Sequence, residues 1–81
     1  MNNETLKEIS EIIFFLNYRI KHFEQLRDEE VFKKNYSEAN NYDFLSIGLL
    51  YSKKDILARY DKKVQNKILE YVLKLERKET L

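Results

Sequence analysis

The stretch from Thr5 to Leu26 constrains the fold more than any other part of the chain. Apolar residues recur along it at spacings of three and four, the pattern of an amphipathic helix: Leu6, Ile9, Ile13, Leu16, Ile20 and Phe23. Residues 12–16 read IIFFL, five apolar residues without a break. Because successive helical residues point about 100° apart, such a run reaches every side of the helix. We therefore expect this helix to pack on more than one face.

The near absence of helix-breaking residues extends this prediction to the whole chain. The 81 residues contain no proline and one glycine, Gly48. Apolar residues make up 43% and charged residues 36%, which is too apolar for a disordered segment. The length suits a single domain over residues 1–81. A domain this small is close to the size below which one hydrophobic core gives only marginal stability. The sequence predicts an all-α protein.

Three helices are predicted, at approximately residues 5–27, 43–51 and 53–79. Thr5 and Glu8 have the spacing of a capping box at the start of the first helix. The asparagines between Asn35 and Asp43 favour turns and mark the main interruption. The third helix either runs unbroken or breaks near Tyr60–Asp61, where Asp61 offers a new cap. These elements predict a small three-helix bundle, or a long helical hairpin with a short middle helix.

Such a bundle has more apolar side chains than it can cover. The following residues are candidates for burial: Leu6, Ile9, Ile12, Ile13, Phe15, Leu16, Ile20, Phe23, Leu26, Phe44, Leu45, Ile47, Leu50, Ile56, Leu57, Tyr60, Val64, Ile68, Tyr71, Val72 and Leu75. Phe14, Tyr18 and Leu73 remain as surplus. Since a small monomer gains little net stability from its core, we expect these groups to be buried in a homodimer or against another protein.

Nothing in the sequence indicates an enzyme. His22 is the one histidine, and its position on an outer stripe of the first helix favours a surface imidazole over a general base. Glu4, Glu8 and Glu11 share a helix face but lack the histidine partners of a helical di-metal site. The chain has no cysteine, no Gly-rich phosphate loop, no zincin motif and no calcium loop. We expect no catalytic residue, cofactor or metal.

The aromatic residues indicate where a partner protein would bind. Tyrosine suits interfaces because its large ring is ordered at low entropic cost while its hydroxyl stays hydrated. Phe14, Tyr18 and His22 form one candidate surface, and Tyr36 and Tyr42 a second. The favoured hypothesis is a non-enzymatic small regulator, inhibitor or accessory subunit that occludes or bridges another protein. Compact helical proteins of this size are common among phage and mobile-element products.

The rival hypothesis is a DNA-binding regulator resembling a helix-turn-helix protein. Its contacts would come from Lys62, Lys63, Asn66 and Lys67 in the basic C-terminal helix. The match is poor at the turn, where a helix-turn-helix needs a small residue and an apolar residue but this sequence has Lys62 and Lys63. A membrane partner is not expected, because the longest apolar run is five residues and Glu70 and Glu76 interrupt the basic face. The expected location is the cytoplasm.

Overall fold

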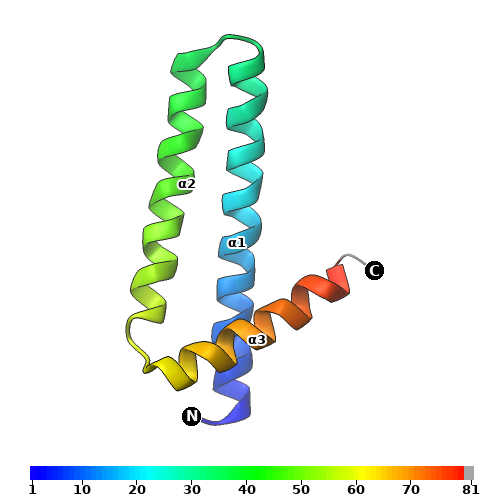
Figure 1. The fold of residues 1–81 in the computed structure, drawn as a ribbon, viewed down its shortest axis with the longest axis vertical. Helices are drawn as coiled ribbons and strands as arrows, with labels where there is room; N and C mark the ends of the chain where they lie inside the picture. The colour runs from blue at the N-terminus through cyan, green and yellow to red at the C-terminus, as the bar shows by residue number, and fades with distance from the viewer. Residues whose placement is uncertain (80–81) are drawn as a thin grey trace.

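Three α-helices make up the computed structural model, which describes residues 1–79. Helix α1 (Asn3–Phe32) and helix α2 (Tyr36–Leu57) lie antiparallel as a long hairpin, and helix α3 (Lys62–Glu79) crosses α1 near its N-terminal half (Figure 1). The described residues contain no strand, so the predicted all-α fold is confirmed. The elongated molecule has principal extents of 48 × 30 × 15 Å.

The middle helix is longer than predicted. Helix α2 has 22 residues where the sequence indicated a short helix over 43–51, and α1 continues to Phe32 where an end at residue 27 was expected. Asn40 and Asn41, interpreted as turn formers, lie inside α2. Asparagine only weakly disfavours a helix, and here the packing of the first turns of α2 on α1 outweighs that preference. The description as a hairpin with a short middle helix is therefore wrong.

Side chains cap the N-terminal ends of α1 and α3. The carboxamide Oδ1 of Asn2, rather than the Thr5 hydroxyl, accepts a hydrogen bond at the start of α1, from the Thr5 backbone N–H at 2.8 Å. The helical conformation is interrupted before Asp61. The Asp61 carboxylate accepts a hydrogen bond from the Val64 backbone N–H at 2.9 Å and so caps α3. Gln65 closes this turn by donating from Nε2 to the Leu57 and Tyr60 carbonyls, both at 2.8 Å. Of the two alternatives for the third helix, the break near Tyr60–Asp61 is the one present. Residues 53–57, predicted to begin the third helix, belong to α2.

The turn between α1 and α2 is a Schellman motif with an unusual residue at its centre. Lys34 N–H donates to the Val31 carbonyl and Asn35 N–H to the Glu30 carbonyl, each at 2.9 Å. Lys34 has a φ of 62°, in the left-handed region that glycine normally occupies at this position. The helix ends here because of these hydrogen bonds, and a lysine Cβ is strained there.

Lys34→Gly is expected to stabilise the protein by about 1 kcal/mol, because glycine adopts this backbone conformation without the Cβ clash. For a domain of this size, such a gain raises the thermal midpoint by roughly 4–8 °C. Circular-dichroism melting measures it. Lys33→Gly is the matched control, since Lys33 has a φ of −78° and gains nothing from glycine. A lower midpoint for Lys34→Gly would contradict the assigned turn.

The core lies where α3 crosses α1. Ile13, Ile68 and Val72 are its buried members. Partly buried residues surround them: Leu6, Ile9, Phe14, Leu16, Ile56, Leu57, Tyr60 and Val64. The buried Ser10 hydroxyl is satisfied within the helix because it donates to the Leu6 carbonyl at 2.7 Å. The core is therefore small and sits at one end of the hairpin.

Small, polar and aromatic side chains join α1 to α2 farther up the hairpin. The most buried residues of α2 are Ala39 and Ser46, which allow the two helices to approach closely. Arg27 of α1 donates from its guanidinium to the Asp43 carboxylate of α2 at 2.8 Å, and this hydrogen bond raises the pKa of Arg27. The rings of Phe23 and Tyr42 stack at 6.3 Å between centroids.

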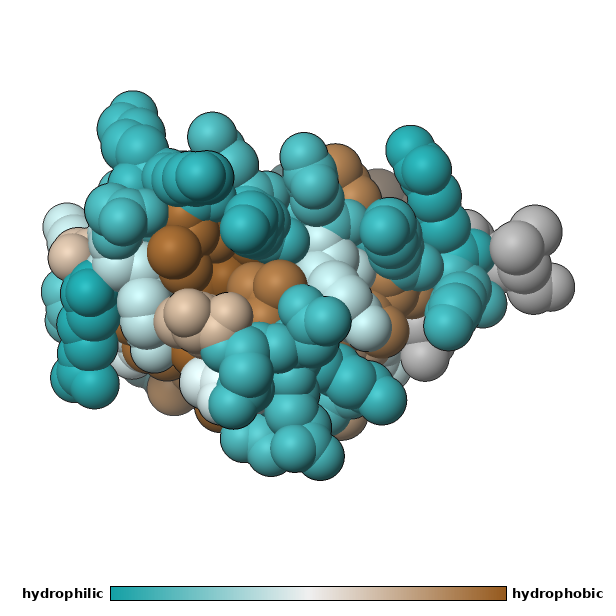
Figure 2. All heavy atoms as spheres, turned by 90° about the horizontal axis from the view of Figure 1, so that it is seen from below, coloured by the Kyte–Doolittle hydropathy of each residue, from teal (hydrophilic) through white to brown (hydrophobic). Residues whose placement is uncertain are grey.

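Several residues predicted to be buried are exposed in the single chain: Ile12, Phe15, Phe44, Leu45, Ile47 and Leu50. Of the four in α2, Phe44, Leu45 and Ile47 are outside because the buried side of α2 carries Ala39 and Ser46 instead. Phe44 lies two residues from Ser46, so it points roughly 160° away from the buried side. Seen from below, along the hairpin, apolar side chains are also visible between the polar ones (Figure 2). One copy of the chain leaves much of its apolar surface uncovered.

Within residues 1–79, no helix has both the length and the apolar character needed to cross a membrane.

Candidate functional site

A cleft forms where residues from all three helices meet. It has a volume of about 460 Å³ and is lined by Phe14, Asn17, Tyr18, Ile20, Lys21, Leu50, Lys53 and Glu76. We call it the three-helix cleft. Its volume lies within the range of about 300–1,000 Å³ that is usual for ligand sites. Because each helix contributes to it, the complete fold is needed to build it.

The helical repeat of α1 places most of the lining. Phe14, Asn17 and Lys21 follow one another at spacings of three and four, so they lie along one side of α1. Asn17 faces α3, where its Nδ2 donates to Glu76 Oε1 at 3.5 Å, a long hydrogen bond. On the opposite wall, α2 contributes Leu50 and the half-buried Lys53.

Apolar and cationic groups determine what the three-helix cleft can bind. Phe14, Ile20 and Leu50 supply apolar surface. The lining contains two positive charges, on Lys21 and Lys53, and one negative charge, on Glu76, so it is mildly positive. Such a site can accept an apolar side chain that is accompanied by an acidic group.

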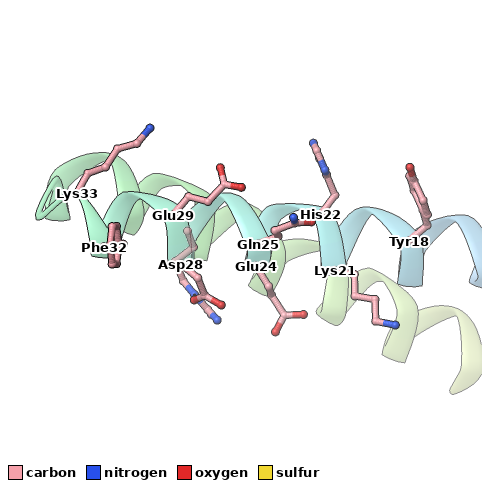
Figure 3. Close-up of a pocket in the computed structure, with 10 residues that line it drawn as sticks. Tyr18, Lys21, His22, Glu24, Gln25, Asp28, Glu29, Phe32 and Lys33 are labelled. Carbon is pink, nitrogen blue, oxygen red and sulfur yellow. The ribbon is translucent and has the colours of Figure 1, made fainter.

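A second, shallower depression follows the C-terminal half of α1. Its lining residues come from this helix and its C-cap, Lys33: Tyr18, Lys21, His22, Glu24, Gln25, Arg27, Asp28, Glu29, Phe32 and Lys33. Figure 3 shows Tyr18, His22, Glu29 and Lys33 projecting from one side of the helix, while Glu24 and Lys21 point from the other. This is a helix surface and not an enclosed pocket, so it suits contact with another surface.

The three residues of the first predicted surface, Phe14, Tyr18 and His22, all lie on α1. Tyr18 is 64% exposed and, together with Lys21, lines both depressions. Phe14 is half-buried, because it packs against the core while lining the three-helix cleft. His22 is exposed one turn beyond Tyr18, with its ring 5.9 Å from that of Phe23. The three residues therefore lie along one continuous stretch of α1.

The second predicted surface is not formed as expected. Tyr36 is 60% exposed at the start of α2, whereas Tyr42 is half-buried and stacks on Phe23 of α1. Six residues apart on a helix, the two side chains point about 120° away from each other. Tyr42 has a structural role in holding the hairpin, and Tyr36 alone is displayed.

Sequence reasoning missed an apolar exposed surface on α2. Phe44, Leu45, Ile47 and Tyr51 are exposed on the side of α2 that faces away from α1. The available signal was the composition of residues 44–52, FLSIGLLYS, which contain no charge. A helix that is apolar all round is normally buried on all sides. We define Phe44, Leu45, Ile47, Gly48 and Tyr51 as the outer face of α2.

The residues proposed for DNA contact are exposed on α3: Lys62, Lys63, Asn66 and Lys67. A four-residue connection, residues 58–61, separates α3 from α2. Asp61 occupies this connection as the cap of α3, and Glu70 is exposed one turn beyond Asn66. Both carboxylates lie beside the lysines and weaken their attraction for phosphate groups.

Among the described residues, no three His, Asp or Glu side chains are grouped so that they could hold a metal ion. The chain matches no family model, no curated protein and no solved structure.

Proposed function

We propose that this protein is a non-enzymatic protein-binding module, acting in the cytoplasm as a small regulator, inhibitor or accessory subunit. Its binding site is the three-helix cleft together with the adjoining surface of α1 at Tyr18 and His22. The observation that carries the proposal is Tyr18, a large ring 64% exposed at the junction of the two depressions. Exposed tyrosines beside apolar clefts are typical of the residues that dominate protein interfaces.

The lining of the three-helix cleft indicates the kind of partner. An apolar side chain of the partner would enter between Phe14 and Leu50, while an acidic side chain would approach Lys21 and Lys53. An amphipathic helix laid along α1 offers both groups at spacings of three or four residues. Binding would then block the partner's own surface, or bridge it to a second protein.

Tyr18→Ser tests this site. The variant removes an exposed ring, so folding should be kept while the affinity for the partner falls at least tenfold, as expected for an interface hot spot. The measurement is capture of the partner from host cells by the tagged protein, followed by titration with the purified partner. Tyr36→Ser is the matched control, because Tyr36 is equally large and 60% exposed at the far end of the hairpin.

Two results would contradict the proposal. In the first, Tyr36→Ser loses the partner and Tyr18→Ser keeps it. In the second, the protein shifts duplex DNA with a steep salt dependence, and neutralising Lys62, Lys63 and Lys67 abolishes the shift. The second result would establish the DNA-binding alternative, which the exposure of these lysines on α3 favours.

A further inference from the structure

The outer face of α2 is apolar, exposed and uncharged. Phe44 is 71% and Tyr51 62% exposed, and Leu45 and Ile47 are exposed between them. None of the residues 44–52 carries a charge. Leu50 lies one helical turn from the buried Ser46, about 120° away from Phe44, and lines the three-helix cleft, whereas Phe44 and Tyr51 do not. The face is therefore separate from the site proposed above.

Gly48 forms a notch near the centre of this face. A Cβ built on Gly48 would meet nothing within 4 Å, so no group of the same chain uses the space. Glycine weakens a helix interior relative to alanine, and within one copy nothing offsets that cost. A glycine on an exposed helix face does allow a second helix to approach closely, with an apolar side chain of that helix in the notch.

We propose that a second copy of this chain covers the outer face of α2, with the two α2 helices packed antiparallel about a two-fold axis between Ile47 and Gly48. A two-fold axis at this point pairs Phe44 of one copy with Tyr51 of the other, twice. It also places each Ile47 against the Gly48 notch of the other copy. The face is thus self-complementary, which an isologous interface requires.

Charge favours the antiparallel orientation over the parallel one. Lys54 and Asp55 follow the apolar face at its C-terminal end, and the N-terminal end carries Asn40 and Asn41. A parallel pair would place like charges together, Lys54 beside Lys54 and Asp55 beside Asp55 of the other copy. The antiparallel pair separates them and brings Asp55 opposite the Asn40 amide, which can donate to the carboxylate. The antiparallel pair also sets the two helix dipoles in opposite directions, which is the favourable arrangement for neighbouring helices.

The area of the face fits a second copy. The exposed parts of its four side chains, Phe44, Leu45, Ile47 and Tyr51, amount to about 500 Å² per chain. Pairing two copies would remove about 1,000 Å² from water, the lower limit for a specific interface. The dimer should accordingly be weak, with a Kd in the micromolar range. A surface this apolar is at the upper end of what monomers expose.

Analytical ultracentrifugation of the whole chain over about 1–500 µM, a range that brackets such an affinity, tests the proposal. The wild type should change from monomer to dimer within this range. Phe44→Asp should raise the dimer Kd at least tenfold. Phe15→Asp is the matched control, because Phe15 is 63% exposed on α1, outside the outer face of α2, and its variant should dimerise as the wild type does.

Gly48→Ala separates the dimer from the fold of one copy. Alanine favours the helix, so the monomer should melt at a higher temperature, while filling the notch should raise the dimer Kd. A higher melting temperature of the monomer together with a higher dimer Kd cannot result from a destabilised chain, because destabilisation would lower the melting temperature.

Cross-linking tests the orientation, since the chain has no cysteine of its own. Ile47→Cys lies beside the two-fold axis and should form an inter-chain disulfide on mild oxidation, whereas Asp55→Cys should not. Three results would overturn the inference: a wild type that stays monomeric throughout, a dimer lost in Phe15→Asp and kept in Phe44→Asp, or efficient cross-linking of Asp55→Cys. None of these bears on partner binding through Tyr18, so the two proposals can fail separately.

Discussion

Ile13→Ala is expected to lower the free energy of unfolding by about 3 kcal/mol, since it deletes three carbons from a site with no exposed surface. Ile13 lies where α1 meets α3, against the buried Ile68 and Val72. A domain of this length has a total stability of roughly 4–12 kcal/mol, so the loss is a large part of it. Urea denaturation followed by circular dichroism measures the change.

Ile12→Ala is the control for this experiment. It makes the same chemical change one residue earlier, at a side chain that is half exposed, and should cost less than about 1 kcal/mol. Equal losses at the two positions would show that α1 faces α3 with a different side from the one described.

Ala39→Leu is expected to destabilise the protein by about 2 kcal/mol, because a larger side chain must separate two closely packed helices. Ala39 is only 4% exposed on the side of α2 that meets α1. The hairpin would open near the Arg27–Asp43 ion pair, so that loss of hydrogen-exchange protection should concentrate in the adjoining turns. Thermal or urea unfolding gives the total effect.

Asn40→Leu is the neighbouring control. Asn40 is exposed, and leucine has the higher helix propensity, so this variant should be neutral or slightly stabilising. If Ala39→Leu proved as harmless as Asn40→Leu, the face of α2 that packs against α1 would have to be a different one, such as that of Phe44 and Tyr51.

Hydrophobic periodicity predicts the buried stripes of α1 and α3 well and the buried side of α2 poorly, for one physical reason. Ile13, Ile68 and Val72 belong to regular stripes and form the core as expected. In α2 the largest apolar residues were assumed to face inward. The structure instead packs Ala39 and Ser46 against α1. A pattern based on large apolar residues does not identify small side chains as buried, although such side chains allow two helices to approach closely.

The candidate site was partly predictable. Phe14, Tyr18 and His22 share α1, and their common stripe is visible in the sequence. The contributions of Leu50, Lys53 and Glu76 to the three-helix cleft depend on how α2 and α3 cross α1, which no local pattern indicates. The turn at Lys34 was hidden for a related reason, since a lysine gives no sign that it will adopt the conformation typical of glycine.

The position of the core has a consequence for synthesis of the chain. Ile13 emerges from the ribosome before Ile68 and Val72, which cover it and follow more than 50 residues later in the chain. The α1–α2 hairpin consists of neighbours in sequence and can pair as soon as residue 57 is available. The growing protein therefore carries an open apolar strip until α3 has been translated. During this period a chaperone or a partner has access to a surface that α3 later covers.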